Sequence, residues 1–277
     1  MDQWTKHMKQ QQTLIMTILS SVLLLSACHK EPAKQQEQAA SSTQNSNPDV
    51  LPYLDIQTKR AEYALPFCEK KNCIDIDIQS LVTKDPWLNH WITANQSKVV
   101  QAQIDLKQNL SLQQAINAYV KKSDDWQHEF SANQPYRLHI QTRVASQRNQ
   151  YVLLQMQVSS RQADVEIKER QYFFVADRKL QKDLSILDVI EPKQQVAFDG
   201  TVQSAYQQWL KKQTKNVQLA APKKLHWGQA DWFFDGEGVG LHYRANEIVK
   251  DAKQLEIFLN KSQTQQMLKA DVFHKMF

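Results

Sequence analysis

The chain contains little glycine. Five glycines occur in 277 residues, and all of them lie at or after position 200. Loops that bind nucleotide phosphates need glycine where the backbone approaches the anion, so residues 1–199 hold no Walker or dinucleotide-binding fingerprint. The later run GEGVG (residues 236–240) lies between two aromatic segments. We interpret it as a hairpin turn that requires positive φ, rather than as a phosphate loop.

Charge of one sign is not in clear excess. Lysine and arginine number 34, aspartate and glutamate number 29, and the formal net charge at pH 7 is +5. Residues 28–277 hold 32 basic and 28 acidic side chains, a surplus of +4, and the basic residues do not gather into a block. A nucleic-acid-binding surface needs such a block, so we expect no nucleic acid partner. The small surplus favours anionic surfaces slightly.

Sequence motifs for catalysis and for metal binding are missing. The eight histidines form no His-x-x-x-His or His-Glu-x-x-His spacing, and no Gly-x-Ser-x-Gly elbow occurs. We therefore expect no catalytic residues, no metal and no cofactor, although residues distant in sequence can still assemble into a site. The side chains that could suggest a site have simpler explanations. Asp75 and Asp77 fit solvent-facing positions of a strand, and Asp124 and Asp125, near His128, fit a solvated loop. His139 and His242 fit hydrogen-bonded or surface histidines.

Long apolar runs are absent except for one, at residues 13–25. Lys6, His7 and Lys9 precede it, and the small residues Ser26 and Ala27 follow it. A charged start, an apolar core shorter than the ~20 residues of a membrane-spanning helix, and a small-residue end are typical of a secretory signal. Residues 1–27 are therefore predicted to be a signal peptide that begins at Met1 or at Met8.

The four residues Leu25-Ser26-Ala27-Cys28 resemble the lipobox of bacterial lipoproteins. The resemblance implies cleavage before Cys28, diacylglycerol on its sulfur and acylation (typically palmitate) of the new amino group. One acyl chain holds a protein only marginally, whereas two or three anchor it firmly. Because His29 stands where inner-membrane lipoproteins tend to have Asp, the resemblance implies an outer-membrane anchor facing the periplasm rather than an inner-membrane one.

Residues 28–48 are predicted to be a flexible tether, since 29–48 are polar and show no apolar periodicity. Twenty such residues reach roughly 25 Å. The remaining cysteines, Cys68 and Cys73, form an even pair in a chain predicted to be exported, so we expect a structural disulfide. Half of a metal site or a redox pair fits less well, because no matching Cys/His pair exists and four residues separate the two cysteines.

The periodicity of the remaining chain predicts an α+β fold, an antiparallel β-meander sheet packed against helices. Asp85-Pro86 is a helix start, and Ser111 with Gln114 is a capping box. The elements expected are strands at 74–78, 138–144, 152–158, 165–175, 231–243 and 254–259, and helices beginning at Asp85, Ser111, Asp199 and near Ser262.

The segments at residues 174–190 and 232–243, the latter followed by Glu247-Ile248, resemble parts of one extracytoplasmic domain of unknown function. It is the RsiV-like domain, found in the lysozyme-sensing anti-sigma factor RsiV and beside the deacetylase domain of PdaC. FVADRKLQKDLSILDVI (174–190) resembles its aromatic strand, turn and helix entry. WFFDGEGVGLHY (232–243), followed by Glu247-Ile248, resembles its closing strands. The resemblance implies an RsiV-like fold over about 50–270, which we divide into an N-terminal part (49–160) and a C-terminal part (161–277).

This chain departs from the RsiV-like pattern at two places. SRQADVEIKERQ (160–171) replaces a Gly-Gly-Ala-His-like turn, and Asn246 replaces the tyrosine before Glu-Ile. The deacetylase module of PdaC-like proteins is absent from the sequence. These departures bear on binding chemistry more than on the fold.

The sequence favours a non-catalytic, membrane-tethered binding module for an envelope protein or a cell-wall component. A surplus of +4 gives no electrostatic help toward basic lysozymes, whereas peptidoglycan or another anionic component suits its sign. Two alternatives stay open. One is a peptidoglycan-related hydrolase or an accessory of a deacetylase, and the other is a structural or assembly factor of the envelope.

Overall fold

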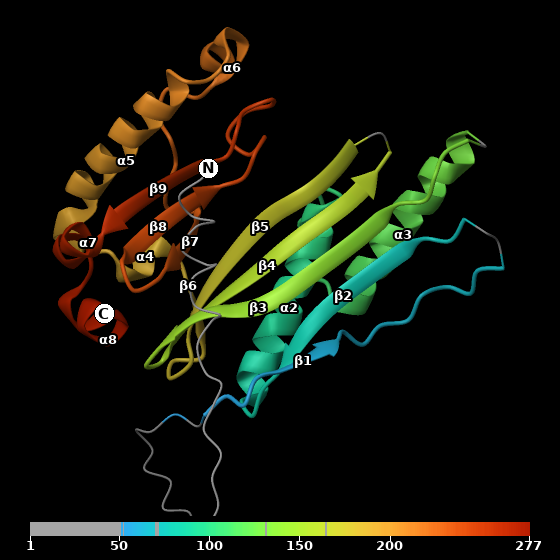
Figure 1. Cartoon of the computed structure of the whole chain (residues 1–277), viewed down its shortest axis with the longest axis horizontal. Coiled ribbons are helices and arrows are strands. Elements are labelled where there is room, and N and C mark those ends of the chain that lie inside the picture. The colour runs from blue at the N-terminus through green and yellow to red at the C-terminus, as the bar shows by residue number, and fades with distance from the viewer. Residues whose placement is uncertain (1–50, 52, 70–71, 131, 164) are drawn as a thin grey trace, which may run out of the picture. The chain divides into compact units, whose positions relative to one another are not determined.

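The computed structural model describes residues 51, 53–69, 72–130, 132–163 and 165–277. The predicted signal peptide and tether, with Cys28, lie outside the described residues. The described residues belong to one compact unit, Asn47–Phe277, with an α+β architecture (Figure 1). Among them, no helix is both long enough and apolar enough to cross a membrane.

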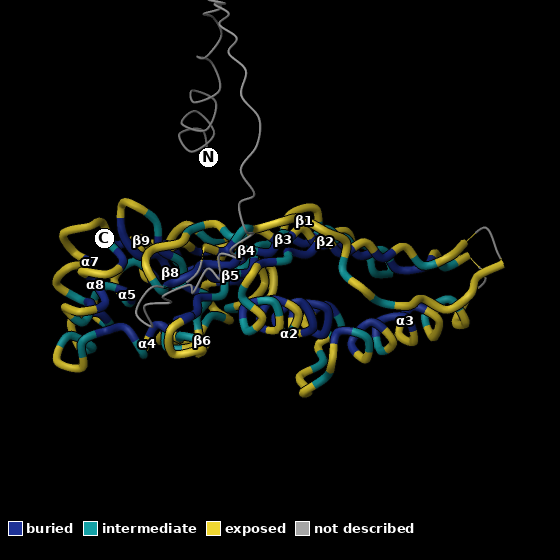
Figure 2. The backbone as a smooth tube through the Cα atoms, turned by 90° about the horizontal axis from the view of Figure 1, so that it is seen from below, coloured by how far each residue is buried: buried dark blue, intermediate teal, exposed yellow. Residues whose placement is uncertain are grey.

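A mixed six-stranded sheet with strand order β1-β2-β3-β4-β5-β6 occupies the first part of this unit. Helices α2 and α3 cover one of its faces (Figure 2), and on the opposite face Tyr151 and Leu153 of β4 and Val175 of β5 pack against the elements that follow β6. The strands are β1 (Gln57–Arg60), β2 (Asp75–Val82), β3 (Arg137–Arg148), β4 (Tyr151–Gln162), β5 (Val165–Asp177) and β6 (Lys182–Leu184), and the helices are α2 (Pro86–Ala102) and α3 (Leu112–Glu129).

Both helices begin where the capping residues predict. Asp85 caps α2 by accepting the backbone N–H of Leu88 at 3.1 Å, and Pro86 opens the helix. Ser111 and Gln114 form a reciprocal capping box at the start of α3. These caps satisfy orphan N–H groups that would otherwise oppose helix formation.

The predicted meander is confirmed for β3, β4 and β5, which pair antiparallel in sequence order. The sheet as a whole is mixed, because β2 and β3 pair parallel, a pairing that the meander prediction did not include. Parallel neighbours need a long crossover connection, and α2 and α3 supply it between these two strands. Period-two alternation identifies a strand but not the direction of its partner.

A three-stranded antiparallel sheet of order β7-β8-β9 follows, packed with short helices. Its strands are β7 (Asp231–Phe234), β8 (Gly238–Tyr243) and β9 (Leu255–Asn260), and the helices are α4 (Ile186–Val189), α5 (Gln195–Leu210), α6 (Lys215–Ala220), α7 (Lys261–Met267) and α8 (Ala270–Met276), with a 3₁₀ turn at Pro192–Gln194.

Two hydrophobic cores meet in β4 and β5. Val152 and Leu154 belong to the core under α2 and α3, whereas Tyr151 and Leu153 belong to the core of the three-stranded sheet. Alternate residues of one strand therefore serve different cores. The expected division at residues 160/161 falls inside β4, so the two parts share a strand.

Two further boundaries differ from expectation, and several short elements had no predicted counterpart. Asp124 and Asp125 lie in the last turns of α3, not in a loop, because buried Ser123 and half-buried Trp126 keep the helix on the core. Helix α5 begins at Gln195 instead of Asp199, since the preceding 3₁₀ turn leads directly into it. The short elements β1, β6, α6 and α8 are too brief to give a periodic signal.

Candidate ligand groove

A groove of about 880 Å³ opens where three segments meet: the end of α2 with the loop that follows it, β5, and the loop after β8. We call it the junction groove. Its lining residues are Lys98, Gln101, Ala102, Asp105, Leu106, Lys107, Gln108, Asn109, Arg170, Tyr172, Arg244, Ala245, Asn246 and Glu247. Both halves of the fold contribute to it, which is common for ligand sites.

Two carboxylates hold the guanidinium of Arg244 in the junction groove. Its Nη1 lies 2.5 Å from Asp231 Oδ2, its Nη2 lies 2.6 Å from Glu247 Oε1, and its side chain is only 17% exposed. The guanidinium also stacks 4.3 Å above the ring centroid of Tyr172. Burial opposes the charge, but the carboxylates of Asp231 and Glu247 outweigh it and raise the pKa of Arg244. The cation is therefore fixed in place.

The groups behind Arg244 are fixed as well. Tyr172 Oη accepts a hydrogen bond from Gln103 Nε2 at 2.9 Å, and the same amide donates to the carbonyl of Val99 at 2.8 Å. Asp231 Oδ2 also accepts the backbone N–H of Phe173 at 3.1 Å. The carboxylate of Asp231 in β7 therefore binds both the backbone of β5 and Arg244, so this wall of the groove is pre-organised.

The charge of the groove lining is positive. It carries four cations, Lys98, Lys107, Arg170 and Arg244, against the two carboxylates of Asp105 and Glu247.

The four cations differ in how far they are neutralised. Lys98 is paired with Asp183 at 3.1 Å, and Arg244 has its two carboxylates. Lys107 and Arg170 make no ion pair with any other described residue. Two cations therefore remain available to an anionic ligand.

The chemistry of the lining suits binding better than nucleophilic catalysis. Among the described residues, the groove wall contains no serine, threonine, cysteine or histidine, so it has no hydroxyl or thiol nucleophile paired with an imidazole base. No group of three or more metal-ligating side chains occurs in the described part of the chain. The groove can supply charge-assisted hydrogen bonds.

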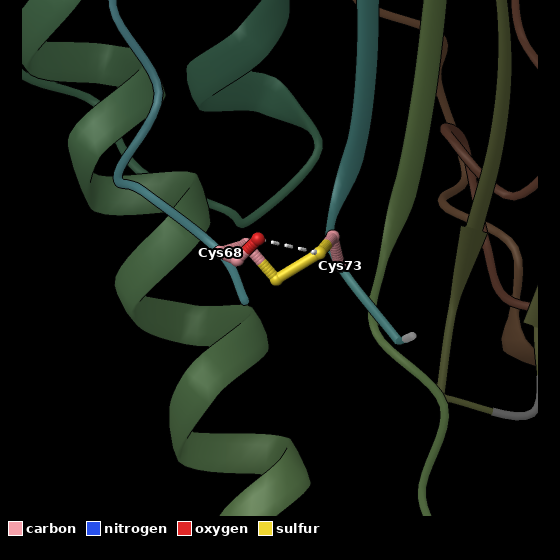
Figure 3. The surroundings of a disulfide bond; sticks show 2 residues. All are labelled: Cys68 and Cys73. Atoms are coloured by element: carbon pink, nitrogen blue, oxygen red, sulfur yellow. Dashed lines mark hydrogen bonds between the residues drawn. A yellow bond between two sulfur atoms is a disulfide. The ribbon is translucent and has the colours of Figure 1, made fainter. Parts of the chain in front are cut away.

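The predicted disulfide is present. Cys68 and Cys73 are bonded, with 5.9 Å between their Cα atoms, just before β2 (Figure 3). A second hollow of about 620 Å³ lies beside it, lined by both cysteines and by α3 residues that include Asp124 and His128. The disulfide joins the two ends of a short exposed segment before β2 and takes no part in the junction groove.

The other acidic and histidine candidates are dispersed. Each lies in a separate pair: Asp75 with His139 at 2.9 Å, Asp77 with Arg60 at 3.2 Å, and His242 with Glu256 at 3.1 Å. The first two pairs lie on the exposed sheet face, whereas His242 is buried against the edge of Phe173. Hydrogen-bonded histidines match the expectation, and none of these pairs lines the junction groove.

The glycine run forms a hairpin turn between β7 and β8, as predicted, but for different reasons at each glycine. Among the described glycines, Gly238 alone has positive φ, +156°, and a Cβ there would lie 1.9 Å from the carbonyl oxygen of Leu259. At Gly240 the Phe233 ring occupies the space of a side chain, 2.1 Å from an added Cβ. A phosphate loop would lead into a helix, whereas this segment leads directly into strand β8.

Sequence reasoning missed most of the groove. One signal was present: Asn246 and Glu247, singled out by the RsiV-like resemblance, lie in its lining. Arg244, Tyr172 and Lys107 carry no motif, because they come from three segments that only the fold brings together.

The comparisons support the fold. No protein-family model matches the chain, and no curated protein matches it by sequence. The crystal structure of a DUF3298 family protein from Pseudomonas aeruginosa PAO1 aligns with a TM-score of 0.58 at 19% identity, covering 82% of this chain and 98% of that chain. A DUF3298 family member from Bacteroides fragilis NCTC 9343 aligns with a TM-score of 0.55 at 14% identity, covering 80% and 97%. The chain therefore has the α+β fold of these DUF3298 family proteins.

Proposed function

We propose that this chain is a lipid-anchored binding module of the bacterial cell envelope, with an RsiV-like domain whose junction groove binds an anionic envelope component, peptidoglycan first of all. The DUF3298-type fold and the Leu25–Cys28 resemblance support the setting. The cationic lining of the groove, which has no serine, threonine, cysteine or histidine among its described residues, supports binding.

The observation that carries the proposal is the pair of cations Lys107 and Arg170 next to fixed Arg244. Peptidoglycan peptides carry carboxylates, and a carboxylate that reaches the groove gains charge-assisted hydrogen bonds from side chains that have no competing ion pair in the described chain. Such contacts are partly exposed, so we expect binding to weaken as salt rises.

Sedimentation with purified peptidoglycan sacculi tests this proposal. The double variant Lys107→Ala/Arg170→Ala should lose most binding at low salt, because it removes both unpaired cations. The double variant Lys211→Ala/Lys212→Ala, at the exposed end of α5, makes the same charge change away from the groove and should bind like the wild type. Equal losses in the two variants, or no sedimentation of the wild type, would refute groove binding.

The anchor is tested separately at Cys28. The Cys28→Ala variant should no longer incorporate labelled palmitate, and the wild type should fractionate with the outer membrane, as His29 implies. Equal palmitate labelling of both proteins would remove the lipid anchor from the proposal while leaving the groove to be judged on its own assay.

A further inference from the structure

The face of the six-stranded sheet that points away from α2 and α3 carries a row of uncharged amides. Gln141, Gln157 and Gln171 stand opposite one another on β3, β4 and β5. Gln79 and Gln155 lie beside them and, with Gln141 and Gln157, line a hollow of about 220 Å³ to which Arg143, Thr58 and Thr142 also contribute. All five glutamine side chains are exposed or half-buried, while the residues that alternate with them face the core. We call these five residues the glutamine row.

Part of the glutamine row is held rigid and part is free. Gln155 accepts from Arg143 Nε at 2.7 Å and donates to Gln171 Oε1 at 2.9 Å, so its amide is oriented. The side-chain amides of Gln79, Gln141 and Gln157 make no hydrogen bond to other described residues. Each amide offers two donors and one acceptor, and strand spacing sets neighbouring amides about 5 Å apart across the sheet.

Aromatic rings continue the glutamine row at one end. Phe173 stands opposite Gln155 in the register of β4 and β5, and its ring lies 5.2 Å from that of Phe233. Phe233 in turn lies flat across Gly240 and stacks at 6.3 Å and 20° on Phe258, which is 44% exposed. The uncovered surface therefore passes from amides to an apolar stacking platform.

We propose that this surface, the glutamine row with the Phe173–Phe233–Phe258 platform, binds an uncharged polysaccharide. Sugar hydroxyl and acetamido groups need paired donors and acceptors, which amides supply, and the C–H faces of sugar rings pack on aromatic rings. The five amides are uncharged, and charged neighbours on this face already have partners within it: Arg143 donates to Gln155, Arg60 pairs with Asp77, and His139 pairs with Asp75. The row therefore complements a neutral, hydroxyl-rich ligand. This site is separate from the junction groove and adds glycan recognition to the anion binding proposed there.

Titration of the isotope-labelled protein with an uncharged hexamer of N-acetylglucosamine, followed by NMR, tests the proposal. The side-chain NH₂ resonances of Gln141 and Gln157 should shift and saturate. The variant Gln141→Ala/Gln157→Ala should weaken binding by about tenfold, as expected for the loss of two hydrogen-bonding groups. Gln207→Ala/Gln208→Ala, on the exposed side of α5, removes two amides elsewhere and should bind like the wild type.

Three results would overturn the proposal: no saturable shift, an equal loss in the Gln207/Gln208 variant, or unchanged binding in the Gln141/Gln157 variant with an unperturbed thermal midpoint. If the hexamer instead loses affinity only in the Lys107→Ala/Arg170→Ala variant, the glycan occupies the junction groove and the sheet-face site is wrong while the groove proposal stands. If that variant loses sacculus binding but keeps hexamer binding, the groove and the sheet face are two different sites.

Discussion

Replacing Arg244 by methionine should be among the most damaging single changes on the groove wall. Arg244 joins three segments, since it contacts Asp231 of β7, Glu247 of the following loop and the ring of Tyr172 on β5. Methionine keeps the apolar stem of the side chain and removes the charge. Two carboxylates then face one another without their common partner.

The size of the effect follows from burial. Arg244 and Asp231 are 17% and 18% exposed, and removal of one partner of a buried ion pair costs about 3–5 kcal/mol. The residual exposure places the expected loss in free energy of unfolding at about 3 kcal/mol, near the lower end of that range. For a unit of this size, such a loss lowers the Tm by about 6–12 °C.

Urea unfolding followed by circular dichroism measures this loss, and two further variants control it. Lys121→Met breaks a wholly exposed i,i+4 pair with Asp125 and should cost less than about 0.5 kcal/mol. Asp231→Asn combined with Arg244→Met should cost clearly less than the sum of the single changes, because the two groups are coupled. A loss below about 1 kcal/mol for Arg244→Met would refute the view that this cation is fixed by buried carboxylates.

Further predictions concern the backbone, the disulfide and pH. Gly238→Ala should destabilise by more than about 2 kcal/mol, since its Cβ would meet a carbonyl oxygen at 1.9 Å, whereas Gly200→Ala, with nothing within 4 Å, should stabilise α5 by about 0.5–1 kcal/mol; the Tm of each variant checks the sign. Cys68→Ser/Cys73→Ser should cost about 2 kcal/mol, and a reductant should lower the wild-type Tm but not that of the variant. Burial and two nearby carboxylates raise the pKa of Tyr151 to about 12. The contribution of the neutral phenol to the free energy of unfolding should therefore be fully present below pH 10 and decrease as pH rises toward 12. Urea midpoints measured across this range check it.

The sequence predicted elements well where a local chemical rule applies. Asp85, Ser111 and Gln114 mark helix starts through hydrogen bonds within four residues, and the structure has those bonds. Alternation also located β3 and β4. Local rules do not predict strand direction: β2 and β3 are parallel because helices connect them. Nor do they detect very short strands, since the three residues of β6 are too few to show a period.

The candidate site was much harder to predict than the fold. Lys107, Tyr172 and Arg244 are far apart in the sequence, and each is an ordinary residue in its own segment. Their significance lies in a tertiary arrangement: burial makes Arg244 a fixed charge, and the lack of ion pairs within the described chain makes Lys107 an available one. Asp75 and Asp77, which the pattern did single out, prove to be exposed partners of a histidine and an arginine.

The two proposed surfaces depend on one strand. In β5, Tyr172 points to the side of α2 and supports Arg244, while Phe173 points to the opposite face and begins the aromatic platform. The backbone N–H of Phe173 and the guanidinium of Arg244 share a single acceptor, Asp231 Oδ2. A ligand that binds beside Arg244 in the junction groove is therefore separated from the backbone of Phe173 only by Arg244 and Asp231. Because the contact is direct, anion binding in the groove and glycan binding on the sheet face are expected to influence each other through Asp231 rather than to act as independent sites.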